Sequence, residues 1–275
     1  MNKSTSLKTK LLNSPYIVWS ALFVIAPLIF VVYYSFTDID GNFTFENVLS
    51  LTAYTDTIIR SVWFGVVSTI ICLVIAYPIA YIMAHSKAAS QRTMMIMVML
   101  PMWMNFLIRT YCWMVLLQDT GIINTFLGKL GISPVHMINT PGAVILGMVY
   151  DFLPFMILPI YSVMTKLDPS IVEAAQDLGC NRFAVLRKCV IPLSMPGVIS
   201  GITMVFVPSV STFYISQKLG GGSFELIGDV IERLYLTPNQ NNVGAALSMF
   251  LMILILICMA IMNKFSNSSE EGMVI

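Results

Sequence analysis

The sequence predicts an all-α integral membrane protein that crosses the bilayer six times. Apolar residues make up 57% of the 275 residues, whereas charged residues make up 11%. The apolar residues gather into long runs, and a helix needs about 20 mostly apolar residues to cross the hydrocarbon core. The loops between these runs are too short to bury cores of their own, so no separate soluble domain is expected.

Six runs meet this length requirement, and they cover about residues 15–36, 60–84, 93–117, 141–164, 195–215 and 242–263. The third is the least uniform, because Asn105 and Arg109 interrupt it. The first follows three lysines, but its apolar core is long and no small-residue cleavage site follows, so we expect an uncleaved anchor. The membrane domain would then cover residues 15–263, with polar tails at 1–14 and 264–275.

The basic residues predict the orientation. With the N-terminus in the cytoplasm, 10 of the 15 Lys and Arg residues fall in cytoplasmic segments. This bias follows the positive-inside rule. An even number of spans also returns the C-terminus to the cytoplasm and places residues 165–191 there as a cytoplasmic loop.

Residues 168–192 predict a pair of short helices on that cytoplasmic side. Asp168 can cap a helix, and Pro169 suits its first position because a missing N–H costs nothing there. Gly179 suits the left-handed residue that ends such a helix. Asn181 can cap a second short helix that runs to about residue 188, and Pro192 bars its simple continuation.

This loop resembles the Glu-Ala-Ala loop of binding-protein-dependent ABC importer permeases. Glu173, Ala174, Ala175, Gly179 and Pro192 stand at the family's spacings. The resemblance implies the fold of type I, MetI-like permeases, and it implies that these five residues couple the chain to a cytoplasmic ATPase. The two alanines make one side of the helix small enough for a partner to approach closely.

Two positions depart from the family's pattern, because Cys189 stands for an Ile and Ile191 stands for a Leu. Both keep an apolar surface. The chain has no glycine-rich phosphate loop of its own, so it lacks a cradle for ATP. We therefore expect no enzymatic activity and no bound cofactor, with ATP and Mg²⁺ used by a partner. Five scattered cysteines without a C-x-x-C pair argue against a metal site.

Asp151 lies near the middle of the fourth predicted span. A charged side chain at that depth costs roughly 3 kcal/mol on insertion scales, so it should face protein or a water-filled path. Arg109 is the obvious candidate counter-charge. Two interpretations stand side by side: a structural pair that locks two helices, or a carboxylate that meets a cationic substrate.

Aromatic side chains crowd the same region. Trp103, Tyr111, Tyr150 and Tyr214 are candidates for a substrate pathway, with Asn105 and Arg109 beside them. Faces of Trp and Tyr attract ammonium groups, so such a path would pass an organic cation without trapping it. The alternative is an interfacial belt, which forms in any membrane protein.

Residues 101–111, 149–155, 167–179, 213–216, 220–222 and 226–228 resemble the polyamine permeases within this family. The resemblance implies transport of spermidine or putrescine across a bacterial plasma membrane. It also implies a complex with a homologous second permease, two ATP-binding subunits and an extracytoplasmic polyamine-binding protein. No basic tract suggests a nucleic-acid partner.

Three alternatives remain open at this point. The same machine could move another solute, such as iron, thiamine or an anion; the chain could be an ion-gradient-driven carrier; or it could be a membrane scaffold without transport activity. In the outer segment 216–241, Glu225, Asp229 and Glu232 are spaced to share one helix face. That face is a landing surface for an extracytoplasmic binding protein, an attraction for a cation, or an ordinary solvated loop.

Overall fold

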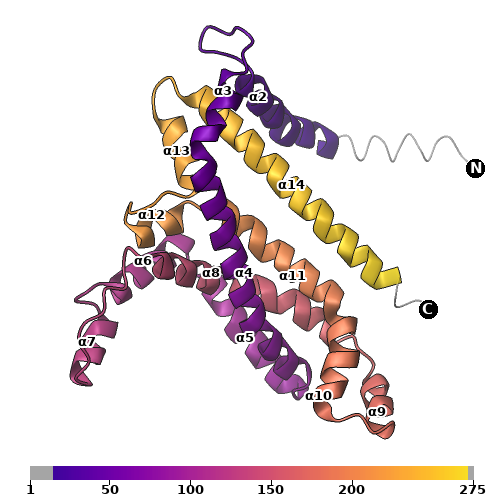
Figure 1. Cartoon of the computed structure of the whole chain (residues 1–275). Coiled ribbons are helices and arrows are strands. Elements are labelled where there is room, and N and C mark those ends of the chain that lie inside the picture. Colours follow the sequence, from indigo (N-terminus) through magenta and orange to yellow (C-terminus); the bar gives the residue numbers. More distant parts are fainter. Residues whose placement is uncertain (1–14, 272–275) are drawn as a thin grey trace, which may run out of the picture. The chain divides into compact units, whose positions relative to one another are not determined.

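The computed structural model describes residues 15–271, and these are almost entirely helical (Figure 1). In this part of the chain the β-structure consists of one isolated bridge between Thr37 and Phe43. By its contacts the chain divides into two units. One holds the described residues up to Thr55 together with Val230–Ile253, and the other holds Asp56–Asp229 with the residues from Leu254 onward.

The elements follow in chain order as η1 Ala21–Ile25, α2 Ala26–Ser35, α3 Glu46–Leu49, η2 Ser50–Tyr54, α4 Thr55–Ala84, α5 Ala88–Trp103, α6 Phe106–Leu117, α7 Ile122–Lys129, α8 Pro141–Met164, α9 Pro169–Asp177, α10 Arg182–Val185, η3 Leu186–Val190, α11 Ile191–Ser211, α12 Tyr214–Gly220, α13 Ile227–Leu236 and α14 Asn241–Glu271. The elements η1 and η3 are π-helical turns, and η2 is a 3₁₀ turn.

Within the described residues, five continuous helical segments are long and apolar enough to cross a membrane. They are Pro15–Ser35, Glu46–Ala84, Pro141–Met164, Arg182–Ser211 and Asn241–Lys264. A sixth crossing is possible only if Ala88–Trp103 and Phe106–Lys129, which meet at 90°, count as one broken span. The predicted tail at 1–14 and the last four residues of the C-terminal tail, 272–275, lie outside the described residues.

The third predicted span, 93–117, is therefore not one straight helix. α5 ends at Trp103, two residues after Pro101, and α6 starts at Phe106. Asn105 caps α6, because its Oδ1 accepts from the backbone N–H of Leu107 at 2.8 Å. An Asn side chain that satisfies a helix N-terminus favours a new helix start over continuation of the old one. This explains why the polar residue in the run coincides with the break.

The larger unit is built around the pair α8 and α11, which pack along one another. Gly197 and Gly201 of α11 allow this close approach. A Cβ atom on Gly197 would lie 2.8 Å from the carbonyl oxygen of Pro159, and one on Gly201 would lie 2.7 Å from Sδ of Met156. Small residues four apart are a common way to bring membrane helices into backbone contact. The large buried residues of this core include Met148, Met156, Ile160 and Val205.

The smaller unit is organised around the backbone carbonyl of Thr37. The amide of Asn47 donates to that carbonyl at 2.9 Å, and the amide of Asn242, at the start of α14, donates to it as well. The large apolar side chains of Pro15–Ser35, such as those of Phe23 and Phe30, are exposed in the isolated chain, whereas Ser35 at its end is buried. This apolar helix therefore has its surface available for lipid or for another subunit.

Candidate functional site

The loop between α8 and α11 begins with a well-capped helix. Oδ1 of Asp168 accepts from the N–H of Ser170 at 2.9 Å, and this backbone hydrogen bond lowers the pKa of the Asp168 carboxyl below its ordinary value. α9 ends in a Schellman motif: Cys180 N–H donates to the Ala175 carbonyl at 3.1 Å, and Gly179 N–H donates to the Gln176 carbonyl at 2.8 Å. Gly179 has a φ of +84°, a conformation that side chains with a Cβ rarely adopt.

The second helix starts where the sequence predicts but does not stop there. Oδ1 of Asn181 accepts from the N–H of Ala184 at 2.8 Å and caps α10. The helical path then continues through the π-turn η3 into α11, so that Arg182–Ser211 forms one segment. The expectation that Pro192 bars this continuation is wrong. Pro192 lies in the first turn of α11, directly after the π-turn, where the altered hydrogen-bonding register accommodates its missing N–H.

We call residues 168–190 the elbow. Its surface carries two large apolar side chains on either side of the glycine turn: Leu178 is 86% exposed and Phe183 is 70% exposed. Ala174 is also exposed, while Ala175 is half-buried. An exposed apolar pair next to a small-residue helix face suits close docking of a second protein.

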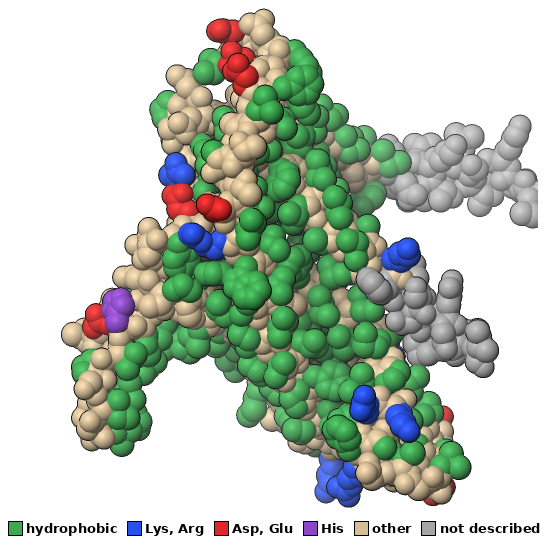
Figure 2. Space-filling view, in the orientation of Figure 1, with side chains coloured by type: hydrophobic (Ala, Val, Ile, Leu, Met, Phe, Trp, Pro, Cys, Tyr) green, Lys and Arg blue, Asp and Glu red, His purple; other side chains and the backbone are tan. Residues whose placement is uncertain are grey.

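Glu173 does not stand alone on that surface. It lines a cavity of about 240 Å³ together with Asp168 and His85, which follows the last residue of α4. Four of the five predicted coupling residues are exposed, namely Glu173, Ala174, Gly179 and Pro192. Glu173 lies at the boundary between α9 and the membrane helices. Figure 2 shows that Lys and Arg side chains gather around the ends of α5, α9 and α10 in the same part of the molecule.

The intramembrane charges form a pair. Nη1 of Arg109 lies 3.1 Å from Oδ1 of Asp151, and the two side chains are 9% and 3% exposed. The distance is that of an ion pair, but the groups are not aligned for a hydrogen bond, and Nε of Arg109 has no acceptor among the described residues. The pair connects α6 with α8. This geometry favours the structural interpretation of Asp151 over direct exposure to a substrate.

Beside this pair lies a cavity of about 350 Å³ with an aromatic lining. Phe106, Phe152, Phe213 and Tyr214 are among its lining residues, together with Ser211 and Thr212. The rings of Phe106 and Tyr214 are 5.9 Å apart, and those of Tyr111 and Tyr214 are 6.2 Å apart. The cavity has an almost wholly apolar lining that includes aromatic residues and contains no carboxylate.

The remaining candidates from the sequence have other positions. The ring of Tyr150 packs edge-on against Trp113, with centroids 5.3 Å apart. Trp103 is 75% exposed at the end of α5, which suits an interfacial ring better than a pathway residue. Asn105 is a helix cap, as described above. Of the predicted set, the structure brings together Tyr111 with Tyr214 and Arg109 with Asp151.

The expected acidic face after the glycine-rich turn does not form as predicted. Asp229 is buried: its Oδ1 accepts from Ser216 Oγ at 2.9 Å and its Oδ2 accepts from Leu226 N–H at 2.8 Å. The second bond is one half of a capping box, in which an acidic residue in the first turn satisfies the N-cap N–H. Asp229 therefore starts α13 and does not belong to an exposed landing surface.

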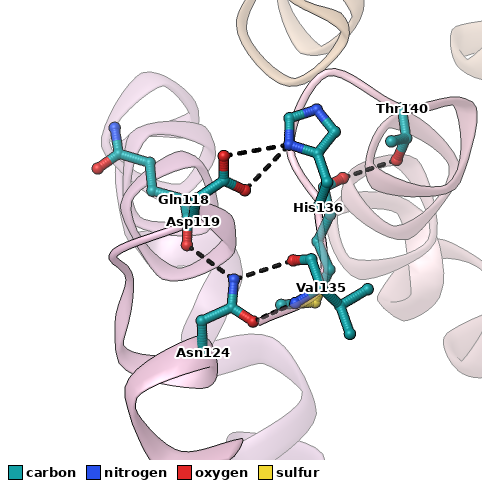
Figure 3. A network of polar contacts seen from close by, with 7 residues as sticks. Gln118, Asp119, Asn124, Val135, His136 and Thr140 are labelled. Atoms are coloured by element: carbon teal, nitrogen blue, oxygen red, sulfur yellow. Dashed lines mark hydrogen bonds and ion pairs between the residues drawn. The ribbon is translucent and has the colours of Figure 1, made fainter. Parts of the chain in front are cut away.

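The segment after α6 is braced by one buried amide. Figure 3 shows Asn124 of α7 bonded to the backbone of Val135 through both of its side-chain polar atoms, at 2.9 Å each, and to the carbonyl of Gln118. On the surface of this brace, Nδ1 of His136 lies 2.9 Å from Oδ1 of Asp119. The sequence predicts no role for Asn124 or His136. The contacts of this segment join residues more than ten positions apart, and no periodic pattern of apolar residues reveals such contacts.

Apolar helices long enough to cross a membrane, joined by a capped loop with exposed apolar side chains, are the architecture of a membrane component of a transport system. Residues 76–269 match the family described as binding-protein-dependent transport system inner membrane component. The spermidine/putrescine transport system permease protein PotB of Haemophilus influenzae is 38% identical over 92% of this chain and 93% of its own length. The protein of the same name in Escherichia coli is 36% identical over 86% of this chain and 89% of its own length.

Solved structures agree in fold. A chain of a bacterial ABC transporter involved in the import of alginate superposes with a TM-score of 0.77 at 17% identity, covering 96% of this chain and 98% of that one. A chain of the MetNI methionine ABC transporter superposes with a TM-score of 0.61 at 16% identity, covering 80% of this chain and 97% of that one. The chain belongs to the family of binding-protein-dependent inner membrane permeases, and it is a multi-pass protein of the bacterial plasma membrane.

Proposed function

We propose that this chain is the permease subunit of a polyamine ABC importer and forms half of the transmembrane path for spermidine and putrescine. The observation that carries the proposal is the elbow, a capped, glycine-ended helix with exposed apolar side chains that continues into a membrane helix. The relatives named above supply the substrate class. The aromatic cavity supports it, because ring faces attract organic ammonium groups without binding them as tightly as a carboxylate.

In this mechanism the energy enters through the elbow. Two ATP-binding partners close on ATP and displace residues 168–190, and the displacement is carried into α11 through η3. A homologous second permease supplies the other half of the path, and an external polyamine-binding protein delivers the substrate. The Arg109–Asp151 pair holds α6 against α8 beside the path, and this chain itself carries out no chemistry on ATP.

Replacement of Gly179 tests the coupling role. Gly179→Ala introduces strain at a φ of +84°, where nothing lies within 4 Å of the new Cβ, so the change alters the turn and not the packing. We expect ATP-dependent uptake of labelled spermidine by the reconstituted complex to fall about ten-fold. A change of this size corresponds to a typical coupling free energy between two sites. Glu173→Gln should reduce uptake as well.

Gly131→Ala is the matched control. Gly131 has a φ of +77° and also has nothing within 4 Å of an added methyl group, but it follows α7 and is not part of the elbow. The control should retain native uptake, and both variants should assemble at native levels. Equal uptake by the Gly179 and Gly131 variants would remove the elbow from the mechanism.

Competition experiments test the substrate class. Unlabelled putrescine should inhibit uptake of labelled spermidine by the native complex, whereas iron, thiamine or a simple anion should not. Uptake by the chain without ATP, driven by an ion gradient, would instead identify a secondary carrier. An absence of flux in every assembly would leave a scaffold as the remaining interpretation.

A further inference from the structure

A lysine side chain occupies the aromatic corner formed by two of the predicted pathway residues. Nζ of Lys218 lies over the rings of Tyr111 and Tyr214, 5.6 Å and 5.7 Å from their centroids. Both distances fall within the range of about 6 Å in which a cation is attracted by a ring face. The two rings stand nearly perpendicular, at 78°, so together they form two walls around one ammonium.

The corner is assembled from two helices. Tyr214 and Lys218 are four residues apart on α12 and so share one helix face, while Tyr111 comes from α6. Lys218 is half-buried, and no carboxylate of the described chain lies within ion-pair distance of its ammonium. The two tyrosines are therefore the nearest electrostatic partners of this charge, through their ring faces and through the Tyr111 hydroxyl group.

The geometry points to an ammonium-binding subsite that the protein caps with its own lysine. Tyr111 and Tyr214 bind one end of the polyamine, and the substrate must displace Lys218 to do so. A lysine is a flexible carbon stem that ends in a primary ammonium, which is also the chemistry of either end of putrescine. The inference rests on the proposed function, since it names the residues that receive the substrate in that path.

The subsite formed by Tyr111 and Tyr214 lies at the edge of the aromatic cavity, as expected of a binding position along the substrate path. Tyr214 also lines the aromatic cavity of about 350 Å³, so a cation that replaces Lys218 is already at the cavity's edge. Phe106 lies next, with its ring 5.9 Å from that of Tyr214. Lys218 shortens the stay of the substrate in the corner, because its own ammonium competes for the same two rings and repels a second cation.

A binding measurement tests the competition directly. The complete complex is placed in nanodiscs without the binding protein, and equilibrium binding of labelled putrescine is measured. Lys218→Met keeps the length of the side chain and removes its charge, so we expect binding about ten-fold tighter than that of the native complex. Lys218→Arg keeps the cation and should bind putrescine within about two-fold of native.

Two further variants separate the subsite from a general charge effect. Lys129→Met removes a lysine charge from an exposed position on α7 and should leave the affinity unchanged. Tyr214→Leu in the Lys218→Met background should abolish the gain, because the ring that binds the ammonium is missing. If Lys218→Met does not assemble, Lys218→Gln provides the same comparison.

Each outcome of these measurements has its own meaning. Equal affinity in the native, Lys218→Met and Lys218→Gln complexes overturns the inference, and so does an equal gain in the Lys129 variant. A different result would reject the proposed function itself. In that case the native complex, in proteoliposomes that contain the binding protein, would show no ATP-dependent uptake of polyamine. Native uptake with no gain on removal of the Lys218 charge rejects the lysine cap alone.

Discussion

Arg109 and Asp151 illustrate how a charge is tolerated at membrane depth. Both side chains are almost completely buried, and each is the other's ion-pair partner within the described chain. Burial of two charges carries a desolvation cost that their attraction offsets only in part. Removal of one partner is worse, since the remaining charge is left in a low-dielectric environment with nothing to neutralise it.

We therefore expect Asp151→Asn to destabilise the protein by about 3–5 kcal/mol, the usual cost of breaking a buried pair. The measurement is the yield of assembled complex after solubilisation, together with polyamine uptake. The double variant Arg109→Gln with Asp151→Asn removes both charges and should recover most of the assembled complex and its transport. A double variant that assembles normally but no longer transports would show that the pair has a role in transport beyond holding α6 against α8.

The residue-scale predictions from the sequence succeeded where a local rule applies. The caps at Asp168 and Asn181 and the left-handed Gly179 follow from backbone chemistry within a few residues, and the structure confirms them. The roles of Asp229 and Lys218 could not be predicted in this way, because tertiary packing brings their partners near. A spacing rule on one helix cannot reveal a partner on another.

At the scale of elements, the contact between α8 and α11 depends on the absence of side chains at two positions. Gly197 faces the backbone of α8, with the Pro159 carbonyl oxygen and the Ile160 Cα both within contact distance of a Cβ. Backbone atoms cannot rotate away as a side chain can. A larger residue at this position must push the helices apart.

Gly197→Leu should therefore lower stability by about 1–3 kcal/mol, the usual cost of overpacking. The check is the temperature at which half of the detergent-solubilised complex is lost. Gly197→Ala and Gly142→Ala form a matched pair: the new Cβ would be 2.8 Å from the Pro159 carbonyl oxygen in the first but 3.7 Å from Thr140 Oγ1, an ordinary contact, in the second. A native melting temperature for Gly197→Leu would contradict the close helix contact.

The elements themselves were predictable to different degrees. The fourth predicted span coincides with α8. A long apolar run such as Pro141–Met164 forms a continuous helix in a membrane, because a helix satisfies all of its backbone hydrogen bonds internally. The third contains a 90° break that length and composition do not reveal. The helix continues past Pro192, contrary to expectation, because the sequence contains no signal for the π-turn that precedes this proline.

At the scale of the whole molecule, the orientation in the membrane is the central expectation, and it rests on the distribution of Lys and Arg. Residues 165–191 should face the cytoplasm, where ATP-hydrolysing partners are found. The segment after α6, which contains α7 and the Asn124 brace, should face the opposite side. Both segments have exposed positions that can carry a probe.

Thiol labelling can determine this orientation. In a chain whose five native cysteines are replaced, Gln176→Cys on α9 and Lys129→Cys on α7 put one thiol on each side. A membrane-impermeant reagent should label the Gln176→Cys chain only in inside-out vesicles and the Lys129→Cys chain only in right-side-out vesicles. Labelling of both variants from the same side would refute the six-crossing topology.

The continuous segment from Arg182 to Ser211 has a mechanical consequence. A torque applied to α10 reaches α11 through continuous helix, so we expect α10 and α11 to rotate together, whereas α9 is joined to them through the Gly179 turn. The π-turn at Leu186–Val190 determines how far α10 is rotated about the helix axis relative to α11. Each residue added to or removed from a helix changes this rotation by about 100°. Deletion of a single residue there would leave both ends folded and point the docking surface in the wrong direction.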